Sequence, residues 1–168
     1  MKKIMTRFIL GLSVAATVIF TGCTLDETAA LSLAKSAGKV AVWTWVAVDN
    51  PDTEVKTTVK EIIIKVKEIT AATTKVGEYV DTVYPIVEPL IDANEKLKDD
   101  QKALAKAGFV IIFTALDEFC ANNEKIITAA DKASKYINAF FDGASKALGS
   151  DTSKIAGKAY KLRAKALK

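Results

Sequence analysis

The chain contains no histidine among its 168 residues. Histidine is the usual general base near neutral pH and the commonest protein ligand of metal ions. The sequence also lacks a glycine-rich phosphate loop, a nucleophile elbow and a cluster of cysteines. We therefore predict no catalytic, cofactor-binding or metal-binding residues, and we predict that the protein is not an enzyme.

Proline is scarce as well, with three residues in the whole chain, while half of the residues are apolar. Alanine and lysine are the commonest residues, and isoleucine and valine are also frequent, which is typical of a mainly helical globular protein. The length suits one domain with its own hydrophobic core. The fold class that we predict is all-α.

The first part of the chain has the layout of an export signal. Lys2, Lys3 and Arg7 precede an uncharged, mostly apolar run, Phe8 to Phe20, which is followed by Thr21, Gly22 and Cys23. The run is shorter than the roughly 20 residues that a membrane span needs, which favours cleavage over an uncleaved membrane helix with an incidental cysteine.

The stretch Phe20-Thr21-Gly22-Cys23 resembles the lipobox of bacterial lipoproteins, although Phe20 stands where that family usually has leucine. The resemblance implies that residues 1–22 are removed and that Cys23 carries a diacylglyceryl group and palmitate as the first mature residue. Thr24 follows in place of the aspartate that favours inner-membrane retention, so the resemblance points to the outer membrane of a Gram-negative host. It covers the first 23 residues only.

The mature chain ends in a basic segment. Residues 152–168 contain no acid, whereas the mature body before them is weakly acidic. This segment is our candidate for contact with anionic lipid headgroups or, through Lys168, with the cell wall, since the terminal lysine is similar to that of the murein lipoprotein. Nucleic acid is not expected as a partner of an exported protein. The basic residues are Lys154, Lys158, Lys161, Arg163, Lys165 and Lys168.

We expect a lipidated tether over 23–30 and a helical bundle over 31–168, with the first helix from about Glu27 to Val48. Trp43 and Trp45 lie about 200° apart on such a helix, so both cannot face the same core. Either the helix is covered on both sides, or one tryptophan lies at the membrane interface.

Residues 49–52, with Pro51, predict a turn that Asp52 or Thr53 closes by capping the next helix. That helix is expected to run unbroken to Val83, because apolar residues alternate spacings of three and four for about four heptads. Gly77 is its weak point. The repeating positions are Val55, Val59, Ile62, Val66, Ile69, Thr73, Val76, Val80 and Val83.

Pro85 predicts a reversal of the chain. The following segment, Leu90 to Phe119, is either one helix or two, the second capped by Asp99, and Gly108–Leu116 is expected to be core. A fourth long helix, capped by Asn122 or Asn123, should end just before Gly149, and a short basic helix should follow from Asp151. The predicted architecture is therefore a bundle of about four long helices, up and down.

Cys120 would have no partner in its own chain once Cys23 carries lipid. It is then either a small buried apolar residue or half of a disulfide between two chains.

The leading functional hypothesis is a non-catalytic, lipid-anchored envelope lipoprotein that acts through contacts with a protein partner, in a structural or exclusion role, with oligomers allowed. The alternatives are a peptidoglycan tether through Lys168, or a carrier of an apolar ligand. A carrier cavity would be lined by the two tryptophans and by Phe109, Phe113, Phe119, Phe140 and Phe141.

Overall fold

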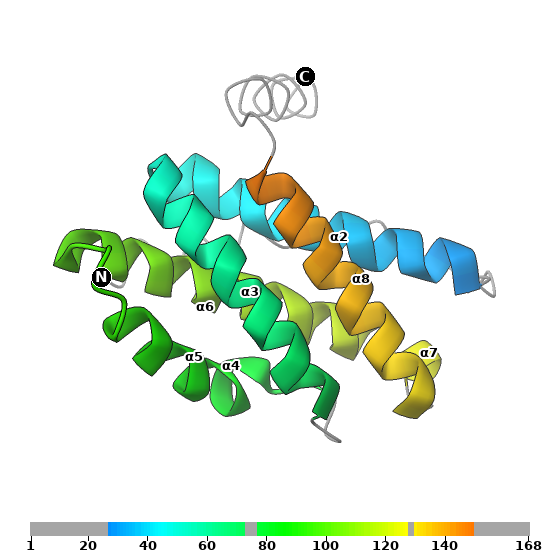
Figure 1. Ribbon diagram of the computed structural model, residues 1–168. Helices are drawn as coiled ribbons and strands as arrows, with labels where there is room; N and C mark the ends of the chain where they lie inside the picture. The colour runs from blue at the N-terminus through cyan, green and yellow to red at the C-terminus, as the bar shows by residue number, and fades with distance from the viewer. Residues whose placement is uncertain (1–26, 73–76, 128–129, 150–168) are drawn as a thin grey trace, which may run out of the picture.

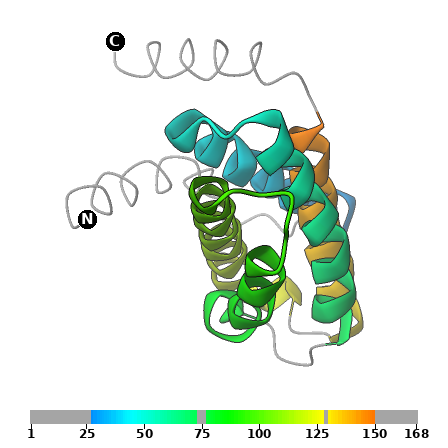
Figure 2. The ribbon, with the colours of Figure 1, turned by 60° about the vertical axis from the view of Figure 1, so that its left-hand side comes forward.

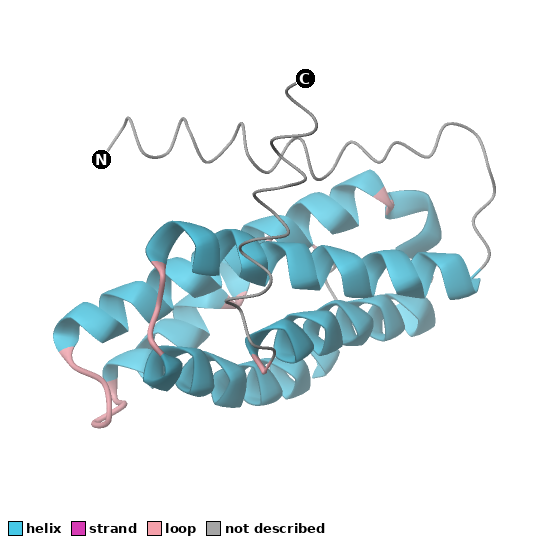
Figure 3. Cartoon of the chain, turned by 90° about the horizontal axis from the view of Figure 1, so that it is seen from above, coloured by secondary structure: helices cyan, strands magenta, loops and turns pink. Residues whose placement is uncertain are grey.

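The computed structural model of the chain describes residues 27–72, 77–127 and 130–149. Within these ranges the chain forms helices joined by short connections and no strand (Figures 1 and 3), which confirms the all-α prediction. The helices are α2 (Glu27–Asp49), α3 (Thr53–Ala72), α4 (Tyr79–Thr82), α5 (Tyr84–Asp92), α6 (Asp99–Asn122), α7 (Glu124–Ile127) and α8 (Ala130–Leu148).

The turn between α2 and α3 is the one predicted at residues 49–52. Asn50 adopts a left-handed conformation with φ 44°, and its N–H donates to the Val46 carbonyl at 3.0 Å. Asp52 then caps α3, because its carboxylate accepts from the N–H of Val55 at 2.9 Å. Gln101 of α6 donates to the same carboxylate at 2.8 Å and so ties the turn to the start of α6.

The predicted unbroken helix up to Val83 is wrong. α3 ends at Ala72, and Gly77 and Glu78 have φ values of 90° and 59°, which a right-handed helix cannot contain. The first half of the apolar repeat does form a buried face of α3 through Val55, Val59, Ile62 and Val66. The later repeat residue Val83 is also buried, but it follows α4, a separate short helix.

α4 and α5 form a return leg that runs along α6 (Figure 1). The prediction that the chain reverses at Pro85 is wrong. Pro85 lies in the first turn of α5, where a backbone N–H has no acceptor within the helix, so the missing N–H costs no hydrogen bond. The reversal comes after Asp92 instead. The segment Leu90–Phe119 is therefore two helices, and buried Leu97 lies in their connection.

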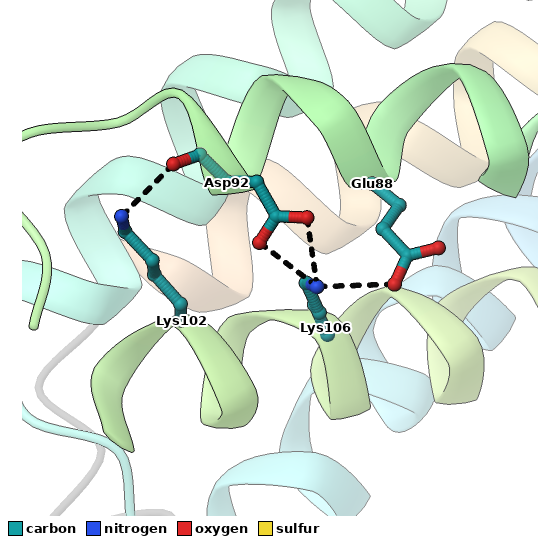
Figure 4. Close-up of polar contacts among 4 residues, drawn as sticks. All are labelled: Glu88, Asp92, Lys102 and Lys106. Carbon is teal, nitrogen blue, oxygen red and sulfur yellow. Dashed lines mark hydrogen bonds and ion pairs between the residues drawn. The ribbon is translucent and has the colours of Figure 1, made fainter. Parts of the chain in front are cut away.

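Ion pairs join α5 to α6 (Figure 4). The Lys106 ammonium lies 3.0 Å from the Glu88 carboxylate and 2.9 Å from that of Asp92, and these carboxylates raise the pKa of Lys106 to about 12. Lys102 donates to the Asp92 carbonyl at 2.9 Å and thereby closes the C-terminal end of α5. Asp99 is the first residue of α6 and not its cap; the N–H of Lys98 is bound by the Gln101 side chain at 2.9 Å.

The four long helices do not form a simple up-and-down bundle in which all neighbouring helices are antiparallel. Lys135 of α8 pairs with Glu27 at 3.1 Å, while Gly38 lies against Phe140, so α2 and α8 run side by side in the same direction. Lys67 pairs with Asp142 at 2.6 Å, and α3 and α8 are antiparallel neighbours (Figures 1 and 2). The direction of the chain still alternates at each step, because the α4–α5 leg supplies the missing return between α3 and α6.

The fourth predicted helix is present in two described pieces, α7 and α8. Its apolar repeat is confirmed in α8, which ends just before Gly149 as predicted. The buried repeat residues are Ala133, Ile137, Phe140, Ala144 and Leu148. The basic helix expected from Asp151 lies outside the described residues.

Candidate functional site

The residues that the sequence singles out lie outside the described part of the chain. They are Cys23 and the basic residues Lys154, Lys158, Lys161, Arg163, Lys165 and Lys168. The structure shows where the described part of the chain begins, at Glu27, and where it ends, at Gly149. α2 starts at Glu27, so residues 27–30 of the expected tether are already helical and only three residues separate Cys23 from the helix.

α2 and α8 are held in backbone contact by two glycines. A β-carbon on Gly38 would lie 1.9 Å from the Phe140 carbonyl oxygen, and one on Gly143 would lie 1.9 Å from the Lys35 carbonyl oxygen. None of the patterns singled out in the sequence predicted this contact. Its signal is a four-residue spacing of small residues, Ala30-Ala34-Gly38 in α2 and Ala139-Gly143-Ala147 in α8, which places them on one face of each helix.

The two tryptophans of α2 point in different directions, as predicted. Trp45 is fully buried, and its indole ring lies so close to Gly108 of α6 that a β-carbon there would be 2.5 Å from the ring. Trp43 is partly buried and also packs against the hydrophobic core, with its indole N–H covered. Since 200° of helix rotation separates the two residues, Trp43 projects from the side of α2 opposite the α6 contact.

We call that side the α2 outer face. It contains no carboxylate and one charge, the ammonium of Lys39. The Ser36 hydroxyl donates to the Ser32 carbonyl at 2.9 Å, so this polar group is already satisfied within the helix. The α2 outer face consists of Ser32, Ser36, Lys39, Val40, Trp43 and Ala47, all of them exposed or partly exposed.

The phenylalanines proposed as a cavity lining pack against one another. The ring centroids of Phe109 and Phe113 are 5.7 Å apart, and those of Phe140 and Phe141 are also 5.7 Å apart. Phe113 meets Phe141 edge to face at 6.4 Å, which joins α6 to α8. These phenylalanines therefore belong to the packed hydrophobic core.

An open groove of about 520 Å³ lies between α3 and α8. Ile64 stands in it with 57% of its surface exposed, beside the ion pair of Lys67 with Asp142. The remaining lining residues are polar: Lys60, Glu68, Asn138 and Ser145. The groove therefore presents one apolar side chain within a polar and charged rim.

The most perturbed titratable groups lie between α4 and α6. The Asp117 carboxylate accepts from the N–H groups of Tyr79 at 2.7 Å and Val80 at 3.1 Å, and burial raises its pKa above the usual range. Burial also raises the pKa of the Tyr79 phenol and raises that of the Cys120 thiol to about 12. A thiol with so high a pKa is almost entirely protonated at neutral pH, so Cys120 is not an activated nucleophile.

Within residues 27–72, 77–127 and 130–149, no three side chains of the kinds that bind metal ions come together. Nor does any helix within those ranges have both the length and the apolar content needed to cross a membrane.

No protein-family model, curated protein or solved structure matches this chain.

Proposed function

We propose that the protein is a non-catalytic lipoprotein of the cell envelope, anchored through lipid on Cys23 and acting through protein contacts at the membrane surface. The observation that carries the proposal is the sequence of the first 23 residues: a basic start, an apolar run of 13 residues and Thr21-Gly22-Cys23. Two or more acyl chains on one cysteine hold a protein stably on a membrane. In a Gram-negative host the outer membrane is the expected location.

The start of α2 supports this arrangement. Three residues between a lipidated Cys23 and Glu27 span at most about 14 Å, so the helical body lies close to the membrane surface. The groove between α3 and α8 is the surface that we assign to the protein partner, with Ile64 as its apolar centre.

The carrier function receives no comparable support, because the aromatic rings that it requires are in contact with one another. The contact function needs no cavity.

Metabolic labelling with palmitate tests the anchor. We expect the wild-type protein and a Cys120→Ser variant to be labelled, since Cys120 is buried in α6, and a Cys23→Ser variant to be neither labelled nor processed. An unlabelled wild-type protein, or a Cys23→Ser variant that still fractionates with membranes, overturns the proposal.

Photocrosslinking in intact cells tests the contact surface. A photoreactive residue at Ile64 should give a discrete crosslinked product, whereas the same residue at Ala103, which is exposed on α6, should not. No product at Ile64, or equal products at both positions, removes the groove from the proposal.

A further inference from the structure

The groove between α3 and α8 has an ordered arrangement of charge around its apolar centre. Lys60, Ile64 and Glu68 all line it and follow one another at intervals of four residues, so they form a single ridge along the exposed side of α3. Lys60 lies about 6 Å along the helix axis on one side of Ile64, and Glu68 lies about 6 Å on the other side. The ridge therefore has a cation at one end, an anion at the other and an apolar side chain midway between them.

This ridge is accessible to another molecule. Ile64 is the most exposed large apolar side chain in the described part of the chain. The groove is open to solvent, since α3 and α8 lie side by side on the face of the molecule that is turned toward the viewer in Figure 1.

The two end charges of the ridge have no partner among the described residues. Neither the Lys60 ammonium nor the Glu68 carboxylate makes an ion pair or a hydrogen bond within residues 27–72, 77–127 and 130–149. They lie about 12 Å apart along the helix axis, too far to pair with each other. Lys67, the other cation of the groove, is already paired with Asp142 of α8 at 2.6 Å. Two charges of opposite sign are therefore available to whatever fills the groove.

The balance of charge restricts the kind of partner. The groove is lined by two cations, Lys60 and Lys67, and by two anions, Glu68 and Asp142. It has no net charge with which to attract a merely acidic or merely basic segment. A complementary partner must instead present an anion, an apolar side chain and a cation in that order and at that spacing. The ridge of α3 itself has this order when it is read in the opposite direction.

We infer that the partner in this groove is a second copy of the chain, paired antiparallel across a two-fold axis at Ile64. The axis places the two Ile64 side chains against each other, and it places Lys60 of each copy opposite Glu68 of the other. A parallel pairing would oppose lysine to lysine and glutamate to glutamate, so the charges also set the orientation. The inference rests on the proposed function, which assigns the groove to a protein partner, and it names that partner.

Sedimentation equilibrium of the full-length protein, in detergent micelles of matched density, measures the dissociation constant of the dimer. Lys60→Glu opposes anions at both ends of the interface and Glu68→Lys opposes cations there, so each variant alone should dimerise about tenfold more weakly than the wild type. Lys65→Glu is the matched control, because Lys65 is exposed on α3 but lies 100° around the helix from Ile64 and off the ridge. It should leave the dissociation constant unchanged.

A mixture of the two ridge variants gives a sharper result. Lys60→Glu has two anions on the ridge and Glu68→Lys has two cations, so each variant is complementary to the other in the same antiparallel register. Carrying different affinity tags, the two should co-purify at concentrations at which neither sediments as a dimer alone. A monomeric wild-type protein, ridge variants that dimerise as well as Lys65→Glu, or a mixture that does not associate overturns the inference.

Photocrosslinking from Ile64 in intact cells separates this inference from the proposed function. A product of twice the mass of the chain, lost in the Lys60→Glu variant, supports the second copy. A product of any other mass leaves the proposed protein contact in place and overturns the second copy. A wild-type protein that carries no lipid overturns the proposed anchor, whereas the sedimentation result still decides whether the chain forms this dimer.

Discussion

Gly38 of α2 and Gly143 of α8 are two halves of one contact, each facing a backbone carbonyl of the opposite helix. A β-carbon at either position would approach that oxygen to 1.9 Å, well inside any tolerated separation. Neither backbone can yield without moving the whole helix, since Ala34 and Ala144 fill the neighbouring positions. The parallel pairing of α2 and α8 therefore depends on the absence of two side chains.

Gly38→Ala and Gly143→Ala should each destabilise the protein. Alanine has the higher helix propensity by about 1 kcal/mol, but forcing apart a packed interface costs about 1–3 kcal/mol or more, so the net change in unfolding free energy is a loss. Urea unfolding followed by circular dichroism measures it. Gly149→Ala is the control, because its β-carbon would lie 3.3 Å from the flexible end of Lys60 and no closer than 3.8 Å to any backbone atom. Equal midpoints for all three variants would contradict the tight contact.

Asp117→Ala should loosen the return leg formed by α4. The substitution removes the carboxylate that binds the N–H groups of Tyr79 and Val80, and loss of hydrogen bonds to a charged acceptor costs about 1–3 kcal/mol. Hydrogen exchange at these two amides should accelerate together. Asp142→Ala, which removes the partner of the solvent-exposed Lys67, should cost less than about 1 kcal/mol and leave those amides protected.

The pH dependence of stability should show two carboxylates acting in opposite directions. The hydrogen bonds from Val55 and Gln101 lower the pKa of Asp52 below 3.8, so its stabilising effect is complete above that pH and is lost as the pH falls through the folded-state pKa. Burial raises the pKa of Asp117 above 3.8, so its ionisation lowers stability as the pH rises through the folded-state pKa.

Urea midpoints between pH 7 and pH 2.5 distinguish the two groups. Asp52→Asn should flatten the acid side of the wild-type profile below pH 3.8, whereas Asp117→Asn should make the loss of stability on acidification steeper. Identical profiles for the two variants would mean that these carboxylates do not titrate in the environments described.

The sequence was a good guide where local chemistry decides the structure. Three features were predicted because each depends on residues close together in the chain: helix α2, the turn at Asn50 and Pro51, and the end of α8 before Gly149. The prediction of a helix up to Val83 was wrong because apolar spacings of three and four residues carry no information about the sign of the backbone φ angle. Gly77 and Glu78 take left-handed conformations, and Asp117, about 40 positions away, secures the new helix that follows.

The candidate site residues also differ in whether their placement follows from local sequence or from residues far away in the chain. Helix geometry alone places Trp43 and Trp45 about 200° apart on α2, and Trp45 is fully buried whereas Trp43 is partly buried against the core. The choice of Trp45 as the inner one depends on Gly108, a glycine in another helix, and no local pattern indicates it. Lipidation of Cys23 and the role of Lys168 stay predictions, since both residues lie outside the described ranges.

The burial of Cys120 favours one of the two interpretations that the sequence left open, a small buried apolar residue, over a disulfide between two chains. It is 5% exposed, and burial together with the nearby Asp117 raises its thiol pKa to about 12, so the reactive thiolate fraction at pH 8 is about 10⁻⁴. We expect iodoacetamide to alkylate it very slowly in the native protein and completely in urea, with mass spectrometry as the readout. Non-reducing gels should show a monomer. The contrary result is a dimer that dithiothreitol reduces to monomers and that the Cys120→Ser variant does not form. It would establish the disulfide between chains and would require α6 to open at this residue.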